Sequence, residues 1–468
     1  MFTKDHTHHR LALDAWRGLA KLRSARARQK RYTYGDQWGD LIRDNNGRIV
    51  TEAEAISSSG REPLTNNLIR RLVKTVVGHY RSDPEVAASY RGIPPELLRR
   101  NALDEIDARM LEEFLISGCA IQRIVDEHRP SGSGLWVDNV SPDRFFANAF
   151  RDPRSTDIDL VGMLHDFSPR EALARFAHGS RRRARALTQL FTAMADDPCS
   201  LSMMGDAAFI QATERHWRLI ELWTLEADEL TLRHDRRNAV LRRVRPDDKD
   251  GADSGWRLRF KWHCRWLAPD GTLIDEYDSP FVHGSHPFVV KFYPLTDGEV
   301  HSFVEDVIDQ QHYINRVLVL IDKMLGASAK GVLLFPENQK MPQLSWQEIA
   351  DSWSRADGII PITGRGNLLP QQVNTPGIGS SAFELLSLEL KLFDDISGVS
   401  SALMGRSDSS NSGSAMYQAQ VHNSALALAD TFRSFRSFTS ARNALLYRTL
   451  AAASPAAGIP AGSPAPAA

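Results

Sequence analysis

The sequence predicts an α+β fold, in which long helices and antiparallel strands occupy separate stretches of the chain. Between Val304 and Leu325, apolar residues recur at alternating steps of three and four, which places them on one face of a helix. A second apolar stripe with helical spacing runs from Leu68 to Tyr80. Between Trp256 and Trp266, large apolar and basic residues alternate with a period of two, which is typical of a half-buried strand.

The composition is that of an ordinary folded protein, and it argues against several classes. The chain has 468 residues, and 57 basic against 58 acidic residues give a net charge of −1. Proteins that grip nucleic acid through its phosphates usually carry a basic excess, so any such surface must be local here. We expect no membrane-spanning helix, because no apolar run reaches about 18 residues, and no signal peptide. The widely spaced Cys119, Cys199 and Cys264 indicate free thiols rather than a disulfide or zinc framework.

The first half of the chain predicts three helices. Residues 1–31 are basic, and their apolar spacing indicates a basic amphipathic helix. Thr65 or Asn66 can cap the helix that runs to Tyr80. A third helix is expected over 101–117, with Gly118 suited to end it.

Strand patterns dominate two later regions. Strands are predicted at 121–125, 135–137, 160–164, 217–223 and 256–266. Ser168-Pro169-Arg170-Glu171 begins a helix between them, because Ser caps, Pro suits the first turn and Glu suits the positive helix end. Asp270-Gly271 predicts a turn that brings 273–277 back as a hairpin partner. The strand at 256–266 would present one strongly basic face, made of Arg257, Arg259 and Lys261.

The strongest helical signal lies at 304–325. The apolar seam consists of Val304, Val307, Ile314, Leu318, Ile321 and Leu325, with Gln311 as its one polar position. A helix of about 25 residues is roughly 38 Å long. Such a seam requires a partner helix, either in the same chain or in a neighbouring subunit.

A small, polar stretch separates two apolar helices near the end. One helix is expected over 381–396 and another over 414–450, with the loop 397–413 between them. A loop of this length inside a compact domain is usually functional or disordered. The Ala- and Pro-rich tail from 451 to 468 has the composition of a disordered segment.

Catalytic signatures are missing from the sequence. It contains no GxxxxGK[ST] phosphate loop, no GxSxG elbow and no HExxH pair. Glu305, Asp306 and Asp309 form an acidic patch that could hold a divalent metal in a nuclease, but a solvated helix face explains the patch better. We therefore expect no catalytic residues, no cofactor and no metal. A helical scaffold protein unrelated to phages is a further alternative.

Three stretches of the sequence resemble the portal proteins of tailed bacteriophages, and specifically the divergent group of short-tailed phages. The first runs from Gly35-Asp36-Gln37-Trp38 through Pro63-Leu64-Thr65-Asn66-Asn67 to Gly78-His79-Tyr80-Arg81. The second runs from Trp136-Val137-Asp138 through Asp143-Arg144-Phe145-Phe146 to Asp157. The third runs from Ile396 to Gly405 and continues through Ser412-Gly413-Ser414-Ala415 into the long helix. Their order along the chain carries more weight than any one of them.

The resemblance implies a portal fold with wing, helical stem, β-rich clip and crown, in which the crown is short or absent here. The implied order is a basic N-terminal arm (1–59), wing (60–226), first stem helix (227–245), clip (246–296), second stem helix (300–326), wing again (327–396), channel loop (397–413), and a long helix towards the crown (414–450). Subunits, usually twelve, would form a ring at one capsid vertex. We expect the seam residues Val304, Val307, Ile314, Leu318 and Ile321 to lie between subunits.

The resemblance also implies a function in DNA passage. Double-stranded DNA would be packaged and ejected through the ring, with the large terminase, then head–tail adaptor proteins, docking on Arg257, Arg259 and Lys261. The major capsid protein would surround the ring, so the protein would belong to the virion after assembly in the host cytoplasm. A portal of a gene transfer agent would have the same sequence features. The residues expected in the channel loop are Ser397, Gly398, Ser400, Ser401, Arg406, Ser407, Ser410, Asn411 and Ser412.

Overall fold

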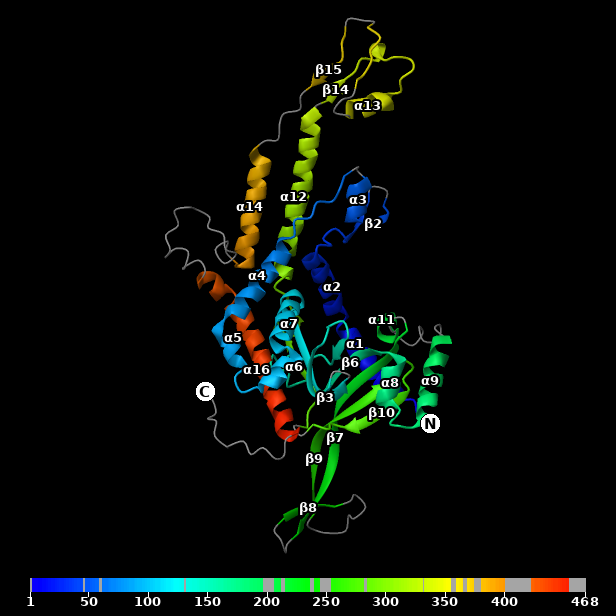
Figure 1. The fold of residues 1–468 in the computed structure, drawn as a ribbon, viewed down its shortest axis with the longest axis vertical. Coiled ribbons are helices and arrows are strands. Elements are labelled where there is room, and N and C mark those ends of the chain that lie inside the picture. The colour runs from blue at the N-terminus through cyan, green and yellow to red at the C-terminus, as the bar shows by residue number, and fades with distance from the viewer. Residues whose placement is uncertain are drawn as a thin grey trace. The chain divides into compact units, whose positions relative to one another are not determined.

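A computed structural model of the chain confirms a mixed α+β fold (Figure 1). It describes residues 2–44, 47–58, 61–129, 132–196, 206–211, 215–235, 240–244, 254–281, 284–330, 332–354, 359–364, 368–373, 380–399 and 422–453. The chain forms two compact units. Unit 1 contains residues 1–30, 76–303 and 428–468, and unit 2 contains residues 31–75 and 304–427.

Two antiparallel sheets form the centre of unit 1. The larger sheet has six strands in the order β10-β9-β7-β6-β5, with β8 paired to β7. Its strands are β5 (Phe145–Ala147), β6 (Leu160–Phe167), β7 (Trp217–Asp235), β8 (Val240–Val244), β9 (Ser254–Leu267) and β10 (Leu273–Asp278). The smaller sheet has the order β11-β3-β4, from β3 (Cys119–Arg129), β4 (Gly132–Asn139) and β11 (Phe288–Phe292). The strands β12 (Pro294–Thr296) and β13 (Glu299–Val300) pair separately.

Helices cover these sheets. The first is α1 (His6–Gly18), whose buried Trp16 packs beside Phe209 with 5.8 Å between the ring centroids. The other helices of unit 1 are α5 (Pro84–Ser89), α6 (Pro95–Asn101), α7 (Leu103–Ser117), α8 (Pro169–Phe176), α9 (Arg181–Asp196), α11 (Ala207–Ile210) and α16 (Ala429–Ala453). Gly118 ends α7 in the left-handed conformation, with φ of 71°. A Cβ atom there would lie 2.7 Å from Val300, so the position requires glycine.

Unit 2 is built around two long helices, α12 (Glu305–Lys330) and α14 (Ser380–Ser397), which pack side by side (Figure 1). Between them in sequence lie β14 (Val332–Leu334), the 3-10 helix η1 (Glu337–Gln339), α13 (Trp346–Ser354) and β15 (Gln371–Val373). Because β14 pairs with β15, the chain returns beside the end of α12. The hairpin β1 (Leu41–Arg43) and β2 (Ile49–Thr51) and the helix α3 (Glu52–Ser58) also belong to unit 2. Two further helices, α2 (Ala20–Tyr34) and α4 (Leu68–Ser82), contain residues of both units.

Most sequence-predicted elements are confirmed. The basic N-terminal helix occurs as α1 and α2, and Ser168 and Glu171 form a reciprocal cap at α8. The hairpin at Asp270-Gly271 joins β9 to β10. The cap of α4 is one or two residues later than expected, because the Asn67 carboxamide oxygen accepts the Arg70 N–H at 2.9 Å.

Two expectations about secondary structure and burial are wrong. The helix expected at 227–245 is instead strand, since β7 continues to Asp235 and β8 covers 240–244. The strand at 256–266 is half-buried only towards its end, because β10 lines β9 from His263 onwards. On β9, Leu258 and Phe260 are 49% and 65% exposed.

Candidate functional site

Most of the apolar seam of α12 is buried within the chain itself, but Leu325 at its end is 51% exposed. Val304, Val307 and Ile314 are fully buried, Ile321 is 6% exposed and Leu318 is partly exposed. The helix α14 of the same unit packs against α12. Val304, Val307, Ile314 and Ile321 are buried by the chain itself, so their assignment to a contact between subunits is wrong, whereas for the partly exposed Leu318 it stays a prediction. The three-four spacing requires a partner without specifying which chain supplies it.

A different apolar surface of the same helices is uncovered in the single chain. On α14, Phe393 is buried but Leu388 is 52% exposed and Phe383 49%. Helices that are apolar on nearly every side are normally buried on every side. We call the exposed apolar residues of both helices outside the seam the uncovered α12–α14 surface; they are Tyr313, Leu320, Met324, Phe383, Leu388, Leu390, Leu392 and Ile396. The apolar stripes predicted from the sequence omitted Tyr313, Leu320, Met324, Leu388 and Leu392, although Leu at 385, 386, 388, 390 and 392 already indicated apolar residues on more than one side of the helix.

Buried amide side chains fix the start of α4 to the middle of α12. Gln311, the polar position of the seam, is fully buried. Its Oε1 accepts the N–H groups of Leu68 at 2.9 Å and Ile69 at 3.3 Å, and its Nε2 donates to the carbonyl of Asn66 at 2.7 Å. Gln311 therefore satisfies two of the N–H groups that a helix leaves unpaired at its beginning.

The same cluster explains the Gly35-Asp36-Gln37-Trp38 run of the sequence. Asn315 donates from Nδ2 to Oε1 of Gln37 at 2.5 Å, and Gln37 donates from Nε2 to the Tyr32 carbonyl at 2.8 Å. Gln37 and Asn315 are both fully buried. The polar residues of this run and of the Asn66-Asn67 pair thus hold the helices of unit 2 together, a role that sequence reasoning did not assign to them.

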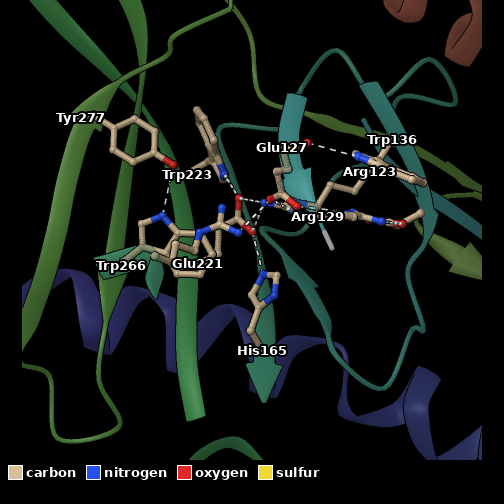
Figure 2. Close-up of polar contacts among 11 residues, drawn as sticks. Arg123, Glu127, Arg129, Trp136, His165, Glu221, Trp223, Trp266 and Tyr277 are labelled. Carbon is tan, nitrogen blue, oxygen red and sulfur yellow. Dashed lines mark hydrogen bonds and ion pairs between the residues drawn. The ribbon is translucent and has the colours of Figure 1, made fainter. Parts of the chain in front are cut away.

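A second buried polar cluster joins the two sheets of unit 1 (Figure 2). Glu221 of β7 is fully buried. It accepts hydrogen bonds from Arg123 of β3 at 3.2 Å and from His165 of β6 at 2.7 Å. A third bond comes from the indole N–H of Trp223 at 2.9 Å. The ion pair between Arg123 and Glu221 therefore connects the smaller sheet to the larger one.

The cluster continues to Glu127, which Arg175 contacts at 2.8 Å and Arg123 at 3.4 Å. A cavity of about 420 Å³ lies against it, with Trp223 and Tyr277 in its lining. Burial alone would raise the pKa of Glu221, but Arg123, together with His165 and Trp223, outweighs burial and holds that pKa well below its usual range. Burial lowers the pKa of His165 in spite of Glu221. Glu221 therefore stays a charged carboxylate, hydrogen-bonded to Arg123, His165 and Trp223. Its ion pair with Arg123 holds the two sheets together.

The comparison with known families decides what these features belong to. The model of the phage P22-like portal protein family matches residues 9–442, which is most of the chain. The chain belongs to this family. No curated protein matches it. Membership confirms the resemblance seen in the sequence, and it implies a structural component of the phage capsid that forms a homo-oligomeric ring.

The strand β9 of this portal protein, which carries Arg257, Arg259 and Lys261, presents a less basic face than the sequence predicted. Lys261 pairs with Asp228 of β7 and with Asp278 of β10, the latter at 3.2 Å. Arg259 is exposed and lies opposite Asp228 in the strand register, and the side chain of Arg257 falls outside the described residues. The prediction of a strongly basic face is wrong at Lys261, because the neighbouring strands supply carboxylates that a single strand's pattern does not reveal.

Only the start of the expected channel loop can be placed in the portal chain. Ser397 is 5% exposed and ends α14, so it is buried rather than presented to a channel. Gly398 follows in the left-handed conformation with φ of 66°, which suits a residue without a Cβ atom at a helix end. The remaining loop residues lie outside the described residues; they are Ser400, Ser401, Arg406, Ser407, Ser410, Asn411 and Ser412.

The alternative as a metal-dependent nuclease gains no support from geometry. Glu305, Asp306 and Asp309 are all exposed on the first turns of α12. Within the described ranges, no group of three or more His, Cys, Asp or Glu side chains could hold a metal ion.

Among the described residues, no helix is long and apolar enough to cross a membrane.

Proposed function

We propose that this portal protein forms a ring of about twelve copies at one vertex of the capsid, within the shell of major capsid protein. Double-stranded DNA enters and leaves through the ring, which docks the large terminase first and the head–tail adaptor proteins afterwards. The uncovered α12–α14 surface carries the proposal. Two long helices with apolar residues left exposed require a further partner, and a neighbouring copy supplies one in a closed ring of head-to-tail contacts.

The structure leads us to propose a different stem and clip from those expected. The packed pair α12 and α14 suits a stem of two helices, and the small module between them, residues 331–379, suits the clip. Two observations support this assignment. The helix expected at 227–245 is strand, so the stretch 246–296 has no first stem helix before it. The module 331–379 follows one long helix directly and precedes the other.

A matched pair of double variants tests the ring. Leu320→Asp with Leu388→Asp places two carboxylates in the uncovered α12–α14 surface, where burial without a partner is costly. We expect subunits that fold but do not form rings, as measured by mass photometry and electron microscopy. The control is Leu41→Asp with Ile49→Asp, at residues that are 70% and 67% exposed elsewhere in unit 2, and it should still form rings. A wild-type protein that stays monomeric would contradict the proposed function.

The channel loop supplies a second test of DNA passage. We propose that the stretch from Gly398 to Gly413 lines the channel, with Arg406 as its cation near the DNA phosphates. Deletion of 407–412 should leave rings intact but reduce the retention of packaged DNA, and Arg406→Ala should show a milder defect. Packaging assays with a nuclease-protection step measure retention directly. Full retention in the deletion variant would remove the loop from the DNA path.

A further inference from the structure

The cavity of about 420 Å³ beside Glu221 has the properties of a binding pocket, and all of its lining residues belong to unit 1. Its volume falls in the range of about 300–1,000 Å³ that ligand pockets occupy. Asp126 and Pro280 are exposed, so the lining reaches the surface of the unit. The apolar part of the lining, which we call the apolar wall, consists of Val125, Trp223, Tyr277, Pro280, Phe281 and Pro287.

Aromatic rings give the apolar wall its shape. The ring centroid of Trp223 lies 6.0 Å from that of Phe281 and 6.1 Å from that of Tyr277. Trp223 is 1% exposed and donates its indole N–H to Glu221, which fixes the orientation of the ring. Phe281 is only half-buried. Because aromatic side chains favour stacked or edge-to-face contacts with other rings, this wall suits a flat apolar group.

The charged part of the lining contains a buried donor. Arg123 is 5% exposed, and its two terminal nitrogens donate to Glu221 at 3.2 Å and to Glu127 at 3.4 Å (Figure 2). Its third nitrogen, Nε, is buried and has no hydrogen-bond partner among the described residues. Buried donors in folded proteins nearly always have a partner. A ligand in the cavity can therefore supply an acceptor for an N–H group that is already held in place.

The charges of the lining determine which acceptor suits this donor. Arg123 and Arg175 stand against Asp126, Glu127 and Glu221, which gives a net charge of −1. Glu127 and Glu221 are each paired with an arginine. Asp126 is exposed and has no ion-pair partner in the part of the chain that the structure describes. The lining thus disfavours a further carboxylate, but it accommodates a neutral carbonyl oxygen at Arg123 and attracts a cation to Asp126.

We propose that this cavity binds a peptide segment of a partner protein, in which an aromatic residue stands next to a lysine or arginine. The aromatic side chain packs against Trp223 and Phe281, a main-chain carbonyl accepts the Nε–H of Arg123, and the basic side chain pairs with Asp126. A polypeptide presents all three groups within two adjacent residues. An aromatic anchor in a pocket, with polar contacts at the rim, is typical of protein interfaces.

The test measures the binding of a capped dipeptide to the full chain. The probe is N-acetyl-Phe-Lys-amide, and its Kd is determined by a titration followed with saturation-transfer NMR. Two comparison probes each lack one feature: N-acetyl-Phe-Glu-amide reverses the charge, and phenethylamine has no carbonyl group.

Two variants, each with a matched control, locate the site. Phe281→Ala removes a ring from the apolar wall, and Asp126→Asn removes the charge at its rim. The control for the first is Phe335→Ala, because Phe335 is also half-buried and lies beside a tryptophan, with 6.2 Å between its ring centroid and that of Trp346. The control for the second is Asp159→Asn, at another exposed residue of unit 1.

We expect the wild type to bind N-acetyl-Phe-Lys-amide with a Kd of about 1 mM or tighter. Phe281→Ala should weaken binding about tenfold, because a ring contact is lost. Asp126→Asn should weaken binding about two- to fivefold, as expected of an exposed ion pair, and it should remove the preference for the Lys probe over the Glu probe. Both controls should keep the wild-type Kd.

Several results would overturn the proposal. If the wild type does not bind the dipeptide, the cavity is not a peptide site. Phenethylamine binding as tightly as the dipeptide would show that no carbonyl is recognised, and the ligand would then be a small amine. Equal losses in Phe281→Ala and Phe335→Ala would place binding elsewhere. If Phe281→Ala lowers the melting temperature, Asp126→Asn still decides, since an unchanged preference for the Lys probe in that variant contradicts the proposal.

Discussion

At the scale of single residues, a buried ion pair attaches the C-terminal helix to the smaller sheet and α7. Arg442 of α16 is fully buried and contacts both carboxylate oxygens of Asp107, at 3.0 and 2.7 Å. Tyr90 and Gln122 donate further hydrogen bonds to the same carboxylate. Buried pairs of this kind are costly to break from one side, because the remaining charge has no partner.

The Asp107 carboxylate therefore offers a sharp stability test. Asp107→Asn should lower the free energy of unfolding by about 3–5 kcal/mol, because it leaves Arg442 buried without a counter-charge. Urea denaturation followed by circular dichroism measures the loss. The double variant Asp107→Leu with Arg442→Met should recover much of it, since no charge then remains buried. A double variant as unstable as Asp107→Asn would argue against uncompensated charge as the cause.

Glu221 predicts how stability depends on pH. Its pKa in the folded chain lies below the value of about 4.3 for an unfolded Glu. Its stabilising effect is then complete above about pH 4.3 and is lost as the pH falls further, because the unfolded chain binds the proton first. Glu221→Gln should cost several kcal/mol at pH 7, and the difference from the wild type should shrink between about pH 4.3 and pH 3. Exposed Glu96, changed to Gln, is the control and should show a small, nearly constant difference; a constant gap for Glu221→Gln would contradict the prediction.

At the scale of elements, one amide decides where α4 begins. Gln311→Leu keeps the size of the side chain but removes the acceptor for the N–H groups of Leu68 and Ile69. Leaving such groups unpaired costs about 1–3 kcal/mol. We expect faster hydrogen exchange at these two amides, measured by mass spectrometry.

The neighbouring Gln310→Leu is the matched control, because Gln310 is adjacent on the same helix and partly exposed. It should leave exchange at 68 and 69 unchanged. Equal acceleration in both variants would show a general loosening of α12 rather than the loss of one cap.

At the scale of the whole molecule, the place where the terminase docks distinguishes two assignments of the clip, to residues 331–379 or to residues 246–296. Leu368 and Leu369, between α13 and β15, are 65% and 62% exposed. If the module 331–379 is the clip, Leu368→Asp with Leu369→Asp should weaken terminase binding at least tenfold in a pull-down titration while rings persist. A leucine side chain that is buried on binding contributes about 1.5–3 kcal/mol, which the aspartate variants would lose.

Charge reversal of Arg257, Arg259 and Lys261 to Glu is the comparison. Under the original assignment of the clip to 246–296, this variant should be the one that loses terminase binding. Loss in the charge-reversed variant, with normal binding in the Leu368 and Leu369 variant, would restore that assignment.

The sequence alone determined the elements whose signal is local. The three-four spacing of 304–325, the Ser168 cap and the Asp270-Gly271 turn all depend on neighbours within a few residues, and α12, α8 and the β9–β10 hairpin follow from them. The family itself could also be inferred from the order of the motifs.

What only the tertiary structure decided depends on partners far away in the chain. The stretch 227–233 became strand because β9, more than twenty residues later, pairs with it, and most of the seam is buried within its own chain. The charge of Lys261 is balanced by Asp228 and Asp278, and Gln311 became the cap of a helix over two hundred residues earlier. A pattern in the sequence states that a face needs a partner, and only the folded chain determines which residues supply it.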